Sequence, residues 1–234
     1  MKFLGNAIEY LLGGAKVGGA SEARLRRWFA LPGADLVLPH GRARYVVGDF
    51  ETSGSGPRRD RLISMGAVVV AQMQVDLADC FTTVLRQERA SANANILVHG
   101  IGGQAQLAGV EPAQGMLDFL EYLGKAPLVA FRADVARAVV ERAMKSILGV
   151  PFRHPWVDLA AVLPALFPKA GCSTLEDWLV HFGLATGTWH DPLADAFVTA
   201  QLLQVALDAA SRAGIVNARR LIDLPNVSRS AAKG

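Results

Sequence analysis

Two acidic residues at the end of an apolar run constrain this chain most. Segment 45–54 reads YVVGDFETSG, so a short apolar run reaches Asp49 and Glu51 just before a turn. Side chains alternate along a strand, which places both carboxylates on one face. Neighbouring carboxylates repel each other unless a positive charge lies between them. Their oxygens suit Mg²⁺ or Mn²⁺, so the pattern predicts a divalent metal site. The alternative is a pair of acids exposed on an edge strand.

Composition limits the class of protein. With 234 residues, 51% hydrophobic and 19% charged, the chain can bury a full core and is not largely disordered. No segment is expected to span a bilayer, and Asn6 and Glu9 interrupt any N-terminal signal peptide. Cys80 and Cys172 fit neither a disulfide framework nor a metal motif, and both are expected to be buried. A cytoplasmic protein without a membrane partner is the resulting expectation.

Positive charge is mild overall but clustered. The net charge of +3 permits nucleic-acid binding without requiring it. The arginine clusters are Arg24, Arg26 and Arg27; Arg42 and Arg44; and Arg58, Arg59 and Arg61. The last cluster follows the acid pair, where a phosphate backbone would have to pass. A solvated loop is the alternative interpretation.

The order of expected elements indicates an α/β fold. Strands are expected at 44–51, 61–71 and 79–87, joined by short links that are typical of an antiparallel meander. A strand at 127–131 and an element that begins at Trp156 alternate with helices expected at 112–123, 134–148, 173–183 and 192–212. Residues 173–176 form a capping box for the third of these helices. This order predicts a mixed sheet with helices packed on it.

The chain divides into three segments. Residues 1–43 form a helical appendage and connector, with helices expected at 3–12 and 21–30, that packs on the main domain. Residues 44–212 form that domain, in which 95–103 is expected to be a Gly-rich loop. Residues 213–234 are a tail that is frayed from 226 onward.

A second acidic position opens the last helix. Segment 189–197 reads WHDPLADAF, in which Asp191 is a helix cap and Pro192 occupies the first turn. Asp195 lies one turn further, and His190 directly precedes the helix. The two side chains could therefore reach one point, where a carboxylate holds metal and an imidazole removes a proton from water. Alternatively, Asp195 only favours the helix dipole and His190 is a loop histidine.

Four motifs in order resemble the DnaQ-like 3′–5′ exonucleases with the DEDDh motif set, the family that includes the proofreading (epsilon) subunit of bacterial DNA polymerase III. The motifs are Asp49-Phe-Glu51-Thr-Ser-Gly54, His99-Gly-Ile101, Trp156-Val-Asp158-Leu and His190-(four residues)-Asp195-Ala196. The resemblance covers 44–210. It implies a ribonuclease-H-like five-stranded sheet, two divalent metal ions (Mg²⁺ or Mn²⁺) and hydrolysis of the terminal phosphodiester at a 3′ end, which releases nucleoside monophosphates.

The resemblance also assigns residues. Asp49, Glu51 and Asp195 would be metal ligands, and His190 would be the general base. The terminal nucleotide would contact a set of residues around them: Thr52, His99, Ile101, Phe131 and Arg132. Ile101 could instead be an ordinary buried loop residue. The implied partner is the 3′ end of a nucleic acid, DNA rather than RNA, and a DNA polymerase complex is a further candidate partner.

The chain departs from the family pattern in the second motif. Ala136 occupies the position of the fourth metal-binding acid. Asp134 is two residues earlier, a rotation of roughly 200° on a helix, so it is either a helix N-cap or a substitute ligand in a rearranged loop. Arg132 adds positive charge that either weakens metal binding or holds a phosphate. Three hypotheses follow: an active exonuclease, an impaired member of the family that binds nucleic acid or protein, or an unrelated metal-free binding domain.

Overall fold

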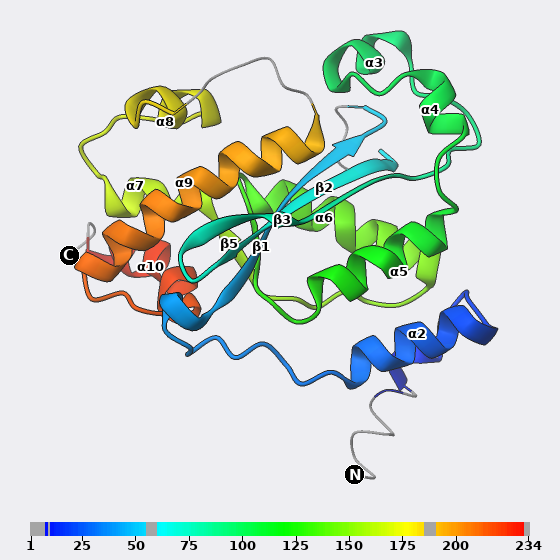
Figure 1. The fold of residues 1–234 in the computed structure, drawn as a ribbon, viewed down its shortest axis with the longest axis horizontal. Helices are drawn as coiled ribbons and strands as arrows, with labels where there is room; N and C mark the ends of the chain where they lie inside the picture. Colours follow the sequence, from blue (N-terminus) through cyan, green and yellow to red (C-terminus); the bar gives the residue numbers. More distant parts are fainter. Residues whose placement is uncertain (1–7, 9, 55–59, 185–190, 232–234) are drawn as a thin grey trace.

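A computed structural model describes residues 8, 10–54, 60–184 and 191–231. Its centre is a five-stranded sheet in the order β3-β2-β1-β4-β5. The strands are β1 (Arg44–Thr52), β2 (Leu62–Ala71), β3 (Gln74–Val84), β4 (Leu128–Ala130) and β5 (Trp156–Asp158). The β1–β2 and β2–β3 pairs are antiparallel, whereas β1–β4 and β4–β5 are parallel. The expected mixed sheet is confirmed (Figure 1).

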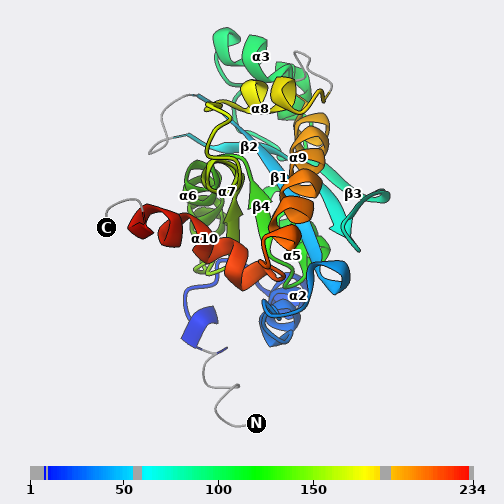
Figure 2. The same cartoon turned by 90° about the vertical axis from the view of Figure 1, so that its left-hand side faces the viewer.

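Helices cover both faces of the sheet (Figures 1 and 2). One face carries α2 (Gly19–Ala30), α5 (Pro112–Leu123) and α6 (Ala133–Ala143), which a π-helical turn at Met144–Leu148 extends. The other face carries α7 (Leu159–Leu166), α8 (Leu175–His181), α9 (Pro192–Arg212) and α10 (Ala218–Ala231). Two separate apolar clusters therefore support the sheet from opposite sides.

Alternation along β1 sets up the site. Val46 packs into the cluster beside α5 and α6, and Tyr45 and Val47 pack into the cluster beside α9. Since side chains alternate, Asp49 and Glu51 continue on the α9 face. The strand thus carries its acids toward the helix that holds Asp195.

The N-terminal helix shares the main core. Leu25 and Trp28 of α2 are buried in the same cluster as the α5 side chains, and Trp28 Nε1 donates a hydrogen bond to Gly124 O at 2.8 Å. The helix expected at 3–12 falls largely on residues outside the described part of the chain, although residues 10–12 are helical.

The β2–β3 hairpin differs from the expectation. Strand β3 begins at Gln74 rather than at residue 79, because Gln72 and Met73 form a two-residue turn with φ of 52° and 63°. Such turns are normally announced by Asn-Gly or Asp-Gly. Neither dipeptide is present at residues 72–73, so this turn could not be predicted from its residues.

Other local expectations were wrong. Of the segment 95–103, expected to be a Gly-rich loop, only 100–102 is a loop, between α3 (Asn93–His99) and α4 (Gly103–Leu107). Most of the tail expected to fray forms α10. The capping box of α8 uses Thr174 and Asp177, one residue later than expected. Neither cysteine is buried: Cys80 is exposed on the edge strand β3, and Cys172 is partly exposed.

Helix α9 also differs from the expectation that no segment would be long enough to cross a bilayer. By length and composition alone its 21 residues would suffice. Half of its most apolar stretch is buried inside the protein, where it packs on β1 and β2. This burial is typical of the core helix of a globular domain.

Candidate active site

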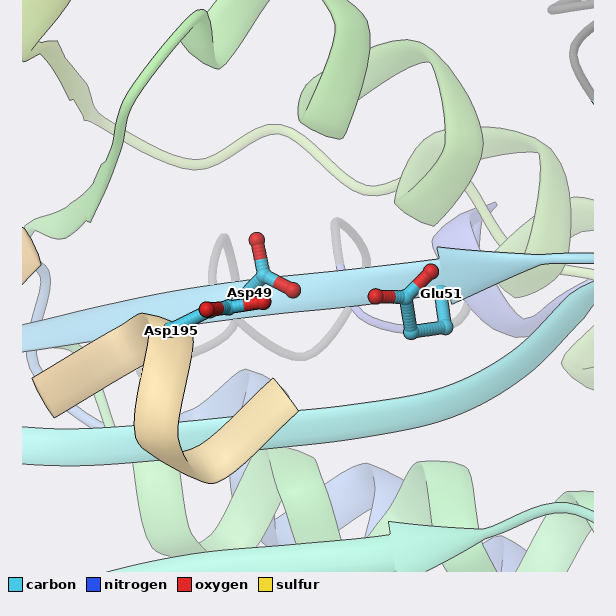
Figure 3. Close-up of side chains that lie close together, drawn as sticks. All are labelled: Asp49, Glu51 and Asp195. Carbon is cyan, nitrogen blue, oxygen red and sulfur yellow. The ribbon is translucent and has the colours of Figure 1, made fainter. Parts of the chain in front are cut away.

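Three carboxylates converge at the end of β1. Asp49 and Glu51 from this strand meet Asp195 from the first turn of α9, and one oxygen of each lies within 4.8 Å of the others (Figure 3). Asp195 lies more than half of the chain length away from Asp49 and Glu51 in sequence, but the three carboxylates meet in space. The structure therefore brings together the three acids that the sequence singled out.

A glycine allows this approach. Gly66 of β2 is the cross-strand partner of Asp49. A Cβ at position 66 would overlap the backbone of Pro192 and Leu193, so the α9 N-terminus sits directly on β2. Asp191 caps the same terminus, as its Oδ1 accepts hydrogen bonds from Leu193 N at 3.0 Å and Ala194 N at 2.9 Å. Gly66 was not identified from the sequence, because only the packing reveals its role.

The cluster is electrostatically strained in the absence of a cation. Burial, followed by the charges of Glu51, Asp195 and Asp191, raises the pKa of Asp49 well above its ordinary value. Burial, followed by Asp195 and Asp191, raises the pKa of Glu51 to about 7. Within the described part of the chain, the charges that raise these two pKa values belong to other carboxylates. The donor set therefore fits a hard divalent cation, which would favour the ionised forms.

A cavity of about 390 Å³ adjoins Asp49 and extends toward α6. Thr52, Phe131, Arg132 and Ala136 are among its lining residues. Position 136 thus faces the cavity from the side opposite β1, as expected for the position of the fourth family acid. The methyl group of Ala136 supplies no ligand there.

Asp134 does not complete the site in this arrangement. It lies exposed in the first turn of α6 and belongs neither to the carboxylate group nor to the cavity lining within the described residues. The N-cap interpretation was also wrong, because the cap is Arg132, with φ of 59°. Asp158 does the capping instead: its Oδ1 accepts from Ala133 N at 3.2 Å and from Ala160 N at 3.1 Å. Asp158 therefore fixes the starts of α6 and α7 together.

The loop after α3 is built around a buried histidine. His99 is only 2% exposed, its Nε2 lies 3.2 Å from Ser91 Oγ, and its Nδ1 accepts from Ile101 N at 3.1 Å. Gln106 Nε2 donates to Ile101 O at 2.8 Å. With both ring nitrogens engaged inside the protein, His99 can affect a substrate only by shaping this loop, whereas Ile101 is partly exposed. The expectation that the loop bearing His99 and Ile101 holds the terminal nucleotide stays a prediction.

Helix α3 is tied to the end of β1. Asn95 Nδ2 donates a hydrogen bond to Ser53 O, and Thr52 Oγ1 donates to Gly54 O at 2.8 Å. The Asn95 bond ties the helix that precedes Ile101 to the segment directly after Glu51 and Thr52. His190, and Arg58 and Arg59 of the basic cluster, lie outside the described residues.

Fold and site together define a ribonuclease-H-like domain with an acidic, metal-compatible centre. Residues 46–203 match the RNase_T family model, described as exonuclease. The match spans most of the chain, so this protein belongs to the exonuclease family. The resemblance to DnaQ-like 3′–5′ exonucleases is thereby confirmed.

Known relatives agree with this assignment. The chain is 27% identical over 183 residues to the PolC-type DNA polymerase III of Thermotoga petrophila and 28% identical over 176 residues to that of Thermotoga maritima. These matches cover 78% and 75% of this chain but only 13% of each polymerase. The chain thus corresponds to a small part of these relatives.

Solved structures share the fold. Escherichia coli exonuclease I in complex with a dT13 oligonucleotide superposes with a TM-score of 0.62 at 18% identity, over 74% of this chain and 42% of that one. Cell-death related nuclease 4 superposes with a TM-score of 0.62 at 16% identity, over 73% of this chain and 66% of that one.

Proposed function

We propose that this protein is a metal-dependent 3′–5′ exonuclease that removes nucleoside monophosphates from the 3′ end of a DNA strand. The observation that carries the proposal is the convergence of Asp49, Glu51 and Asp195 beside a cavity. Membership of the exonuclease family supports the reaction class. The oligonucleotide bound to exonuclease I, a protein of the same fold, supports single-stranded DNA as the substrate.

Asp49, Glu51 and Asp195 would hold Mg²⁺ or Mn²⁺. When bound, such ions stabilise the negative charge that develops on the phosphoryl oxygens. The cavity between β1 and α6 would receive the terminal nucleotide, with Phe131 against its apolar parts and Arg132 near its phosphate. His190 is proposed as the general base that takes a proton from the attacking water. The loop of Ile101, tied to β1 through Asn95, would pack against base and sugar.

Ala136 favours a second candidate function. A site with three acids instead of four would bind metal more weakly, and an impaired member of the family could serve as a nucleic-acid-binding module or protein partner. Cytoplasmic action within a DNA polymerase complex belongs to either proposal, since the curated relatives are PolC-type polymerases.

Degradation of a single-stranded DNA oligonucleotide tests the choice. A 5′-labelled strand should shorten in single-nucleotide steps when Mg²⁺ or Mn²⁺ is present, and a 3′-labelled strand should release labelled mononucleotide at once. Chelation of the metal should stop both. Binding of the strand without shortening, at high enzyme and metal concentrations, would favour the impaired module, and internal cuts would contradict 3′–5′ action.

A further inference from the structure

A second cavity, of about 420 Å³, lies next to the catalytic one. Its lining combines an apolar floor, which includes Leu62, Leu85 and Ile147, with three arginines. Asp60 and Val139 line both cavities, so the two are contiguous. Its volume falls in the range of about 300–1,000 Å³ that is typical of small-molecule sites.

The three arginines reach this cavity from different elements. Arg61 directly precedes β2, Arg86 follows β3, and Arg142 belongs to α6. Arg61 donates to Arg89 O at 3.1 Å, and Arg142 donates to Asp60 O at 3.0 Å, so both groups are held in place. The Arg86 side chain is exposed and makes no hydrogen bond or ion pair within the described part of the chain, which leaves its five N–H donors for a ligand.

Acidic residues only partly offset this charge. Glu88 and Asp60 also line the cavity, so its lining keeps an excess of one positive charge. The Asp60 carboxylate lies on the catalytic side of the junction, because a Cβ at Gly54 would be 2.8 Å from its Oδ1. The arginines therefore face the second cavity with less neutralisation than the count suggests.

An apolar floor with a guanidinium rim suits one ligand chemistry, namely a nucleotide. Bases and sugars pack on apolar side chains, and arginine binds phosphate oxygens through its planar fork. We infer that the second cavity is a nucleotide-binding subsite, in which Arg86 and Arg61 hold the phosphate of an internal nucleotide of the substrate strand. This inference rests on the proposed function for the identity of the strand. A free nucleoside monophosphate would present the same chemistry.

Equilibrium binding without metal tests the subsite, because no hydrolysis then occurs. A labelled strand of about 12 nucleotides, within the footprint of single-strand binding domains, would span both cavities, whereas a dinucleotide would fill only the catalytic one. Arg86→Glu should weaken binding of the long strand about tenfold and lower its salt slope by about 0.7 for one lost phosphate contact. Binding of the dinucleotide should not change. Arg219→Glu, the same charge change at an exposed site on α10, is the matched control.

The possible outcomes distinguish a nucleic-acid strand from a free nucleotide as the ligand, and a failure of this inference from a failure of the proposed function. Length-dependent loss in Arg86→Glu assigns the subsite to the strand. Loss of nucleoside monophosphate binding, without length dependence, assigns it to a free nucleotide. Equal losses in Arg86→Glu and Arg219→Glu, or none in either, would overturn the inference. Failure of the proposed function would appear separately, as an absence of hydrolysis by the wild type with metal, and would leave these binding results intact.

Discussion

The two walls of the cavity beside Asp49 differ in charge, and this difference appears only when they are compared. The β1 wall carries Asp49, and one of its carboxylate oxygens lies within 4.8 Å of an oxygen of Glu51 and of Asp195. The wall formed by α6 presents Ala136 where the family pattern has an acid, and Arg132 lies beside it. The β1 wall therefore carries negative charge that attracts metal, and position 136 on the α6 wall carries none.

The difference is one of chemistry and not of fold. Asp158 accepts a hydrogen bond from Ala133 N and so fixes the start of α6. This start places Ala136 in the lining of the cavity. A carboxylate at this position would enter the cavity that Asp49 also lines. The α6 wall thus faces the same cavity as Asp49 without a carboxylate at position 136, and substitutions on the two walls should have opposite effects.

The largest expected effect lies on the β1 wall. Asp49→Ala should lower exonuclease activity by more than about a hundredfold, beyond the 10–100-fold typical of losing a group that only supports a ligand. It should also stabilise the metal-free protein, because a buried carboxylate among like charges is removed. Degradation assays and thermal melts in EDTA measure the two effects. Asp208→Asn, an exposed acid on α9, is the control and should change neither activity nor stability appreciably. Unchanged hydrolysis in Asp49→Ala would place the active site elsewhere.

The converse substitution on the α6 wall should restore the missing ligand. Ala136→Asp should raise Mn²⁺ affinity and activity by roughly 10–100-fold, the scale on which changes around a metal site act. Calorimetric titration of Mn²⁺ measures the affinity directly, and the oligonucleotide assay measures activity. Ala138→Asp, at an exposed position on the same helix, adds the same charge and should give no gain. Equal gains in both variants would mean that net charge, and not ligation, matters.

Gly66 links the sheet to the position of Asp195. Gly66→Ala should force the α9 N-terminus away from β2 and reduce activity about tenfold, less than the hundredfold that a displacement of about 1 Å can cause. Overpacking should cost about 1–3 kcal/mol of stability. Gly33→Ala, where an added Cβ meets open space, is the control. Weakened Mn²⁺ binding in Gly66→Ala would indicate that Asp195 is displaced and that the protein is not merely destabilised. Wild-type Mn²⁺ affinity would contradict the positioning role.

These residues also show how much of the site could be predicted from the sequence. Asp49, Glu51 and Asp195 were predictable because strand alternation and helix capping are local rules, and the order of motifs located them together. The role of Gly66 was not predictable, since it depends on how closely one helix lies on one strand. Burial of His99 and capping of α6 by Asp158 likewise depend on partners far away in the chain. The Gln72-Met73 turn was missed because its residues lack the usual turn chemistry.

The pH dependence of stability should report the charge on the β1 wall. The pKa of Glu51 rises from 4.5 to about 7 on folding, so between these values the native state holds a proton that the unfolded chain has lost. Stability of the metal-free protein should therefore fall as pH rises through this window, by an amount on the order of 1 kcal/mol after solvent screening. Urea unfolding of the wild type and of Glu51→Gln in EDTA at several pH values isolates the contribution of Glu51 to the free energy of unfolding. Mn²⁺ should reverse the trend in the wild type, and an identical pH profile in Glu51→Gln would contradict the expected coupling.

The smallest effect should come from Asp134, the acid that the sequence offered as a substitute ligand. Its exposed position in the first turn of α6 limits it to the helix dipole, so Asp134→Asn should cost only about 0.3–1 kcal/mol of stability and leave activity within about twofold. Asp158→Asn is the contrasting variant, because that carboxylate accepts hydrogen bonds from two helix starts, and it should cost about 1–2 kcal/mol. A large loss of activity in Asp134→Asn, with Mn²⁺ affinity reduced as in Asp49→Ala, would mean that α6 rearranges on binding metal. Both walls would then supply a metal-binding carboxylate.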